Sequence, residues 1–402
     1  MDMAVAAIED SGNIVVAPGT LPDNDLPGTF FGATISPEEL VAGTVDLTRK
    51  TVYLCGDVSA ISARHVRTAA RVFVVRELSN GPREDESWPV VDSGRVPVRV
   101  HDVGVYYRRF FDLGADHFGR IRAEHTFQSL TESTKPGTAH RRGIYLSPVT
   151  RDGDALRFRL LRCSTNLSGP TEGFRPTDTS IVDALNREAD TVFRDHARLD
   201  HVLAQIYHNT PATADSKQSK AKISAHADKT KDMPANGIMA FCTFYDGLDA
   251  LRPLPEDPFD YGLRRTSGLT GLRFRLKNPA DERPGRPAQF RLTLYPGSVF
   301  FMPLTTNRLY THEIQPSTLD AAVLPTRLGY VVRCSKTEAV HRNGRTFLAH
   351  DGTLVPLEPP TEAGMDELRR LYAEENRTTS VIDYGDRFRF SMNAGDYRAP
   401  RP

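Results

Sequence analysis

Three residues in the second half of this 402-residue chain have the types and spacing of a metal site: His226, Asp228 and His312. In an extended segment alternate residues share one face, so a His-x-Asp pair presents both side chains on the same side. Two imidazoles and one carboxylate form a facial triad, which leaves coordination positions open for non-haem Fe(II) chemistry. We therefore predict that these three residues bind iron and carry the catalysis.

Two arginines follow the second histidine at an even spacing. Arg327 and Arg333 lie six residues apart in the run Arg-Leu-Gly-Tyr-Val-Val-Arg, so they share a face if this segment is a strand. The planar guanidinium group of arginine binds a carboxylate bidentately. The pattern indicates that an anionic co-substrate binds beside the metal.

Together these motifs resemble the AlkB-like branch of the Fe(II)/2-oxoglutarate-dependent dioxygenases. The same resemblance extends to further segments, which are Gln205-Ile-Tyr207, Pro296-Gly297-Ser298-Val299-Phe300-Phe301, Arg308-Leu309 and Ile314-Gln315-Pro316. It covers residues 202–335, about a third of the chain. Gly329 and Val331 stand where the family has Asn and Thr, and Gln205 stands where it has Asn.

The resemblance implies Fe(II) as the cofactor, with 2-oxoglutarate and dioxygen as co-substrates. Carried over residue by residue, His226, Asp228 and His312 would bind iron, and Tyr207, Arg327 and Arg333 would hold 2-oxoglutarate. Oxidative decarboxylation of 2-oxoglutarate to succinate would be coupled to hydroxylation of an unactivated C–H bond. Dealkylation would result where that carbon is bonded to a heteroatom. Which arginine takes which carboxylate stays open.

For the substrate we expect a small molecule, and an anionic compound is one candidate. A modified nucleobase in DNA or RNA is the alternative that the AlkB-like resemblance implies. The lysines between 217 and 231, Arg108-Arg109 and Arg141-Arg142 would then contact phosphates, although a solvated loop is the preferred interpretation of the lysines. A third interpretation, from another class, is a non-catalytic cupin-like binding module. The oligomeric state stays open.

Composition limits the remaining choices. Acidic and basic residues balance at 51 each, which argues against a generally basic nucleic-acid binder. No apolar run approaches the roughly 20 residues that span a bilayer, and the acidic N-terminus lacks the features of a signal peptide. The four isolated cysteines are typical of buried thiols in a reducing compartment, so we expect a cytoplasmic protein without membrane contact.

The pattern of elements predicts a mainly β protein with flanking helices (α+β), built on a double-stranded β-helix, or jelly-roll, core with an N-terminal extension. We expect a β-rich N-terminal extension over residues 1–170, the dioxygenase core over 171–345, and a C-terminal helix and strand over 346–402 that pack on the core. Residues 1–30 read as a loosely ordered lead-in. Apolar periodicity predicts helices over 178–199 and 361–375, and aromatic residues favour a terminal strand or two over 381–393.

Overall fold

The structure is a computed structural model that describes residues 5–9, 12–18, 29–80, 88–131, 138–162 and 167–402. Strands account for 40% of the residues and helices for 21%, so the chain is mostly β, with several sheets and flanking helices. Among these residues, no helix has both the length and the apolar character that crossing a membrane requires.

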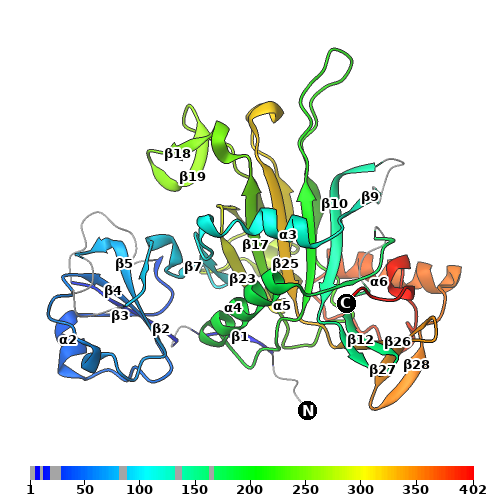
Figure 1. The fold of residues 1–402 in the computed structure, drawn as a ribbon, viewed down its shortest axis with the longest axis horizontal. Helices are drawn as coiled ribbons and strands as arrows, with labels where there is room; N and C mark the ends of the chain where they lie inside the picture. Colours follow the sequence, from blue (N-terminus) through cyan, green and yellow to red (C-terminus); the bar gives the residue numbers. More distant parts are fainter. Residues whose placement is uncertain (1–4, 10–11, 19–28, 81–87, 132–137, 163–166) are drawn as a thin grey trace.

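The largest sheet has nine strands and lies at the centre of the molecule (Figure 1). In spatial order its strands are β13 (Glu172–Gly173), β10 (Thr138–Ser147), β15 (His201–Tyr207), β25 (Thr326–Arg333), β17 (Ile238–Asp246), β23 (Val299–Pro303), β8 (Gly104–Tyr107) and β7 (Val98–Val100), and β9 (Gln128–Thr131) also pairs with β10. All its pairings are antiparallel except that of β10 with β13.

A smaller antiparallel sheet packs against one face of the nine-stranded sheet. Its strands, in spatial order, are β16 (Ile223–His226), β24 (Tyr310–Gln315), β21 (Gly271–Leu276) and β22 (Gln289–Thr293). Phe274 and Tyr310 of the small sheet share one buried cluster with Phe241 and Phe300 of the large sheet. Two facing sheets around one core are what a jelly-roll requires, but the jelly-roll connectivity itself stays a prediction.

Helices cover the opposite face of the nine-stranded sheet. These are α3 (His117–Glu124) and α4 (Pro176–Val192), which lie across the middle of Figure 1. Alternate residues of the central strands, such as Ala204, Ala240 and Tyr330, are fully buried beneath these helices together with Leu185 of α4. The large sheet is therefore covered on both faces, and its strands are buried on both sides. The predicted helix over 178–199 corresponds to α4, which ends seven residues earlier than predicted.

A parallel sheet lies at the N-terminal end of the molecule (blue in Figure 1). Its strands, in spatial order, are β3 (Ala33–Ile35), β2 (Asn13–Val16), β4 (Thr51–Gly56), β5 (Arg71–Ser79) and β6 (Val90–Val91), and α2 (Pro37–Ala42) packs beside them. The prediction of a loosely ordered lead-in was wrong for 13–16, because β2 is fully buried between β3 and β4. Residues 19–28 lie outside the described residues.

A buried carboxylate joins this parallel sheet to the rest of the chain. Glu188 of α4 is fully buried and pairs with Arg71 of β5 and with Arg95, at 2.7 and 2.8 Å. Tyr107 of β8 donates a hydrogen bond to the same carboxylate at 2.7 Å. Burial alone would raise the pKa of Glu188, but the two guanidinium groups outweigh it and lower that pKa to about 2. The junction therefore depends on a charge that must stay paired.

The C-terminal region packs beside the two facing sheets. An antiparallel sheet runs β11 (Thr150–Asp152), β12 (Ala155–Leu160), β26 (Thr337–Arg342), β27 (Arg345–His350) and β28 (Thr353–Pro356), and α6 (Glu362–Arg377) follows it. The predicted helix over 361–375 corresponds to α6. The predicted terminal strands over 381–393 were wrong: that stretch is irregular, and Tyr384, Phe388 and Phe390 pack on Leu368 of α6.

Several short elements complete the described fold: β1 (Ala7–Ile8), which pairs with β14 (Phe193–Arg194), the projecting strands β18 (Arg252–Leu254), β19 (Asp257–Leu263) and β20 (Thr266–Ser267), and α5 (Leu304–Leu309). The nine-stranded sheet takes strands from both sides of residue 170, the expected boundary between extension and core. The parallel sheet ends at Val91.

Candidate metal centre

The predicted metal ligands come from the small sheet and from the loop that follows it. His226, the last residue of β16, is the direct cross-strand partner of His312 in β24. Directly opposed residues of an antiparallel pair project from the same face, and here both rings point toward the facing sheet, with ring centroids 4.5 Å apart. Asp228 lies two residues beyond His226, and the three side chains converge as the His-x-Asp spacing predicts.

The ligand atoms face one another without hydrogen-bonding directly. Asp228 Oδ1 lies 3.6 Å from His226 Nε2 and 3.9 Å from His312 Nε2. Both distances are longer than a hydrogen bond allows. One ligand atom from each of the three residues lies within 4.8 Å of the other two. The His226 Nδ1–H group donates to the Ser224 carbonyl at 2.9 Å. This fixes the tautomer in which the lone pair of Nε2 is free to bind a metal. The donor set fits a divalent transition metal.

Two asparagines that the sequence analysis missed hold the backbone of this motif. Asn307 of α5 makes a double hydrogen bond with Asp228: its Oδ1 accepts from the Asp228 N–H and its Nδ2 donates to the Asp228 carbonyl, both at 2.9 Å. Asn376, in the last turn of α6, accepts from the Ala227 N–H at 2.8 Å. The peptide groups on both sides of residue 227 are therefore fixed by side chains from elements remote in sequence.

The loop continues to be tied down beyond the carboxylate. The Thr230 hydroxyl donates a hydrogen bond to Glu375 of α6. Asp232 is buried and accepts from Arg162 Nε and Nη2 at 3.1 and 2.6 Å, respectively. Lys231 pairs with the same aspartate at 3.1 Å. Helix α6 and the segment just after β12 thus hold the loop that carries Asp228 in place.

Arg333 neutralises the Asp228 carboxylate. Its Nε and Nη2 donate to Asp228 Oδ2 at 2.9 and 2.6 Å, so Oδ1 is left to face the histidines. Burial by itself would raise the pKa of Asp228, but the Arg333 guanidinium and the two histidines outweigh it and hold that pKa well below its usual range. The carboxylate is therefore ionised and oriented before any ligand binds.

Both histidines are held neutral, the form that binds metals. Burial, reinforced by the neighbouring His226, lowers the pKa of His312 to about 3. Burial also lowers the pKa of His226, although 32% of that side chain remains exposed. Phe241 and Phe274 stand beside the His312 ring at centroid distances of 5.5 and 5.7 Å. The metal centre therefore has an apolar inner wall and one accessible edge at His226.

A pocket extends from the candidate ligands along the inner face of the nine-stranded sheet. Its lining includes all six residues that the sequence analysis singled out: Tyr207, His226, Asp228, His312, Arg327 and Arg333. Arg327 and Arg333 both line this inner face, as their even spacing predicts, and direct cross-strand register places Tyr207 beside Arg327. Gln205, Gly329 and Thr243 form the next row of the sheet toward the metal.

The far end of the pocket holds a buried guanidinium that has unsatisfied donors. Arg327 is only 5% exposed, and among the described residues its Nε and Nη2 have no hydrogen-bond partner. Its guanidinium carbon lies 3.9 Å from the centre of the Tyr207 ring. The Tyr207 hydroxyl donates to Gln205 Oε1 at 2.9 Å. Buried, unpartnered guanidinium donors are costly, so this end of the pocket has the chemistry of an anion site.

Gly329 explains how Arg327 reaches into the pocket. A Cβ atom built at this position would lie 2.8 Å from Arg327 Nη1 and 3.2 Å from a ring carbon of Tyr207. Those distances are shorter than normal van der Waals contact. The arginine side chain therefore folds over the glycine, toward the metal ligands, through space that any other residue would fill.

Comparisons with known proteins add little beyond this geometry. No protein-family model matches the chain, and no curated protein matches it. The matches among solved structures include one described as "The structure of OsALKBH1", with 12% identity and a TM-score of 0.36; the match covers 58% of this chain and 99% of that one. The assignment of function below therefore rests on the residues and their arrangement.

The other basic residues that were considered for substrate contact mostly have structural partners. Lys229 donates to the Tyr372 carbonyl near the end of α6, and Lys220 donates to the Ser317 carbonyl. Arg108 and Arg109 stack against Phe259 of β19. The preferred interpretation of the lysines as a solvated loop fits the exposed Lys217 and Lys222, but it was wrong for Lys231, which is buried against Asp232.

A second group of potential metal ligands is a closed hydrogen-bond network. His125 lies between two carboxylates, with Nδ1 3.0 Å from Glu172 and Nε2 2.7 Å from Asp178. Tyr330 also donates to Asp178, at 2.8 Å. Burial would lower the pKa of His125, but the two carboxylates outweigh it and raise that pKa to about 9. Both ring nitrogens are thus engaged, unlike the Nε2 atoms at the candidate centre.

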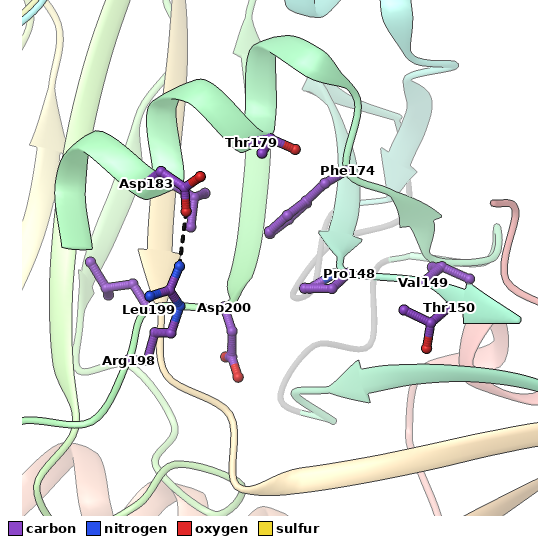
Figure 2. Close-up of a pocket in the computed structure, with 10 residues that line it drawn as sticks. Pro148, Val149, Thr150, Phe174, Thr179, Asp183, Arg198, Leu199 and Asp200 are labelled. Atoms are coloured by element: carbon purple, nitrogen blue, oxygen red, sulfur yellow. Dashed lines mark hydrogen bonds and ion pairs between the residues drawn. The ribbon is translucent and has the colours of Figure 1, made fainter. Parts of the chain in front are cut away.

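A separate cavity lies outside the facing sheets, beside α4 (Figure 2). Phe174 and Pro148 form one wall, and Leu199 and Asp200 face them from the segment that precedes β15. Arg198 and Asp183 close it with an ion pair at 2.8 Å. Burial raises the pKa of Asp200 to about 6. None of the candidate metal ligands lines this cavity.

Proposed function

We propose that the chain is an Fe(II)- and 2-oxoglutarate-dependent oxygenase of AlkB-like type that hydroxylates, or oxidatively dealkylates, a C–H bond of a small molecule. One observation carries the proposal: a single pocket joins a His-Asp-His donor set to a buried arginine with unpartnered donors. A metal site at one end of a pocket and a guanidinium at the other are what a bifunctional oxo-acid co-substrate requires.

His226, Asp228 and His312 would hold the metal, which when bound supplies the activation of dioxygen that oxidation of an unactivated C–H bond requires. Arg333 keeps Asp228 ionised and turns Oδ1 toward the histidines. Arg327 would bind the distal carboxylate of 2-oxoglutarate, with Tyr207 against its guanidinium. The assignment of this carboxylate to Arg327 follows from Arg333 being occupied by Asp228.

Apolar residues between the two ends would exclude water and orient the co-substrate. Leu203, Val331 and Phe241 form the row of the sheet between Gln205 and Arg333. Exclusion of water strengthens the attraction between the arginine and a carboxylate, because the local dielectric constant falls.

Buried free thiols at Cys55, Cys242 and Cys334 support a reducing compartment and hence a cytoplasmic location.

The test is succinate formation from 2-oxoglutarate with added Fe(II) and no other substrate. We expect slow turnover by the native protein, loss of it in His312→Ala, and retention in His350→Ala, which changes an exposed histidine outside the site. Absence of succinate together with absence of iron binding in the native protein would leave the cupin-like binding module as the better interpretation.

The substrate class needs a separate measurement. Binding of a nucleic-acid probe that weakens steeply with salt would favour a nucleobase substrate, since phosphate contacts release counterions. We expect no such binding, because Lys220 and Lys229 donate to backbone carbonyls of the protein itself. Stimulation of succinate formation by members of a panel of small carboxylates and phosphates would identify the preferred class.

A further inference from the structure

Arg141 of β10 belongs to the same cross-strand row as the arginine at the far end of the pocket. Register pairs Arg141 with Tyr207, Tyr207 with Arg327, and Arg327 with Tyr245 across four adjacent strands. Directly opposed residues project from the same face of a sheet. Arg141 is therefore on the inner face, two strand spacings or roughly 10 Å from Arg327 at the Cα atoms.

The hydrogen-bond donors of this row are used unequally. The Tyr245 hydroxyl donates to the Leu294 carbonyl and accepts from the Thr270 N–H, so its one hydrogen-bond donor is already used. The Tyr207 hydroxyl is taken by Gln205. By contrast, the buried Nε of Arg141 and the buried Nε and Nη2 of Arg327 have no partner among the described residues. Two guanidinium groups thus flank Tyr207, both with free donors.

Neither guanidinium has a counter-ion in the part of the chain that the structure describes. The ion pairs there include Arg333 with Asp228, but none that involves Arg141 or Arg327. Two positive charges on one half-buried row, with no carboxylate between them, repel each other and are stabilised by an anion. A carboxylate has two oxygens and about four acceptor sites, so one carboxylate can accept from both arginines.

A glycine gives Arg327 room to lean toward the metal ligands. Gly329 follows Arg327 by two residues on the same face, and Gly143 follows Arg141 in the same way. Register places Gly143 and Gly329 on either side of Gln205. At Gly143 a Cβ would meet Leu130 and Gln205 at 3.1 and 3.4 Å, whereas at Gly329 the nearest atom is Nη1 of Arg327, so it is Arg327 that uses the space above a glycine to lean toward the metal ligands.

We propose that Arg141 is a second cation for the distal carboxylate of the co-substrate, so that this carboxylate is bound between Arg141 and Arg327. The inference rests on the proposed function, because it takes 2-oxoglutarate as the ligand of the pocket. It adds a residue outside the Arg-x5-Arg motif and makes the pocket selective for oxo acids with a second carboxylate.

The experiment measures equilibrium binding of two oxo acids by calorimetry under anaerobic conditions, with the protein loaded with Mn(II). The acids are 2-oxoglutarate and 2-oxopentanoate, which has the same chain length and lacks the distal carboxylate. Arg141→Ala is compared with Arg142→Ala, which removes the same charge from the neighbouring exposed residue on the opposite face. Arg141→Lys tests whether a point charge restores part of the affinity, and melting temperatures verify that each variant is folded.

We expect Arg141→Ala to weaken 2-oxoglutarate binding roughly tenfold, the effect of losing a charged hydrogen bond, and to leave 2-oxopentanoate binding unchanged. Arg142→Ala should bind both acids as the native protein does. Equal weakening of both acids by Arg141→Ala, or no weakening of either, would overturn the role of Arg141 while leaving the proposed function in place. Failure of the native protein to bind 2-oxoglutarate at all would overturn both.

Discussion

A methyl group at Gly329 should displace the arginine at the far end of the pocket. The Cβ of Gly329→Ala would lie 2.8 Å from Arg327 Nη1, whereas ordinary contact begins at 3.4 Å, so the guanidinium must move by about 0.6 Å or more. The obstacle is the mobile end of a side chain, so the cost to folding should stay below about 1 kcal/mol. A charged hydrogen bond contributes about 1.5–3 kcal/mol, and its distortion should cost about half of that.

The expected result is a five- to tenfold rise in the KM for 2-oxoglutarate, roughly 1–1.4 kcal/mol, with metal affinity unchanged. Succinate formation at varied 2-oxoglutarate and fixed Fe(II) measures it. Gly143→Ala is the matched control, because a Cβ there would meet Leu130 and Gln205 at 3.1 and 3.4 Å and not Arg327. A native KM in Gly329→Ala, or an equal rise in Gly143→Ala, would refute the argument that Gly329 positions Arg327.

Three further predictions test the supports of the site. Asn376→Ala should lower metal affinity roughly tenfold, measured by metal titration, because the Ala227 N–H loses its partner and the His-x-Asp segment loosens. Glu188→Gln should lower the free energy of unfolding by about 3–5 kcal/mol in denaturant titrations, because Arg95 keeps a buried charge without its counter-charge. Burial lowers the pKa of His201 to about 3, below the value near 6.5 in the unfolded chain, so the unfolded state binds the extra proton and stability falls as pH drops below 6.5. Between pH 7.5 and 5 the native protein should lose about 2 kcal/mol more than His201→Phe, measured by denaturant titration at both values.

The pairing of His226 with Asp228 was predictable from local rules, whereas His312 joins them through the register of β24 with β16, which no local spacing encodes. The His-x-Asp spacing and the even spacing of Arg327 and Arg333 depend only on the alternation of side chains in extended chain. What the sequence could not show is the support of that motif. Asn307 and Asn376 lie 79 and 149 residues from their backbone partners, and an asparagine that binds a remote peptide group has no sequence signature of its own.

The β-rich character of the N-terminal region was predicted, but strand β2 and the parallel pairing of its sheet were missed for a related reason. Strand β2 is a four-residue segment, one asparagine followed by three apolar residues, among residues rich in Gly, Pro and Asp, and such a segment is too short to show a period. Parallel pairing joins strands that are separated by long crossover connections, so no turn motif in the sequence predicts the pairing. The six-residue helix α2, capped by Ser36 and ended by Gly43, was the available signal.

The charges that line the pocket imply that metal and co-substrate bind together. With both histidines neutral, Asp228 contributes −1 and Arg327 and Arg333 contribute +2, so the lining carries a net charge of +1. A divalent cation alone would raise this to +3, and a dianionic oxo acid alone would lower it to −1. Both together restore +1. A bound dianion would therefore turn the repulsion that the cation meets into attraction, a bound cation would strengthen the attraction that the dianion meets, and by reciprocity each should raise the affinity of the other by the same factor.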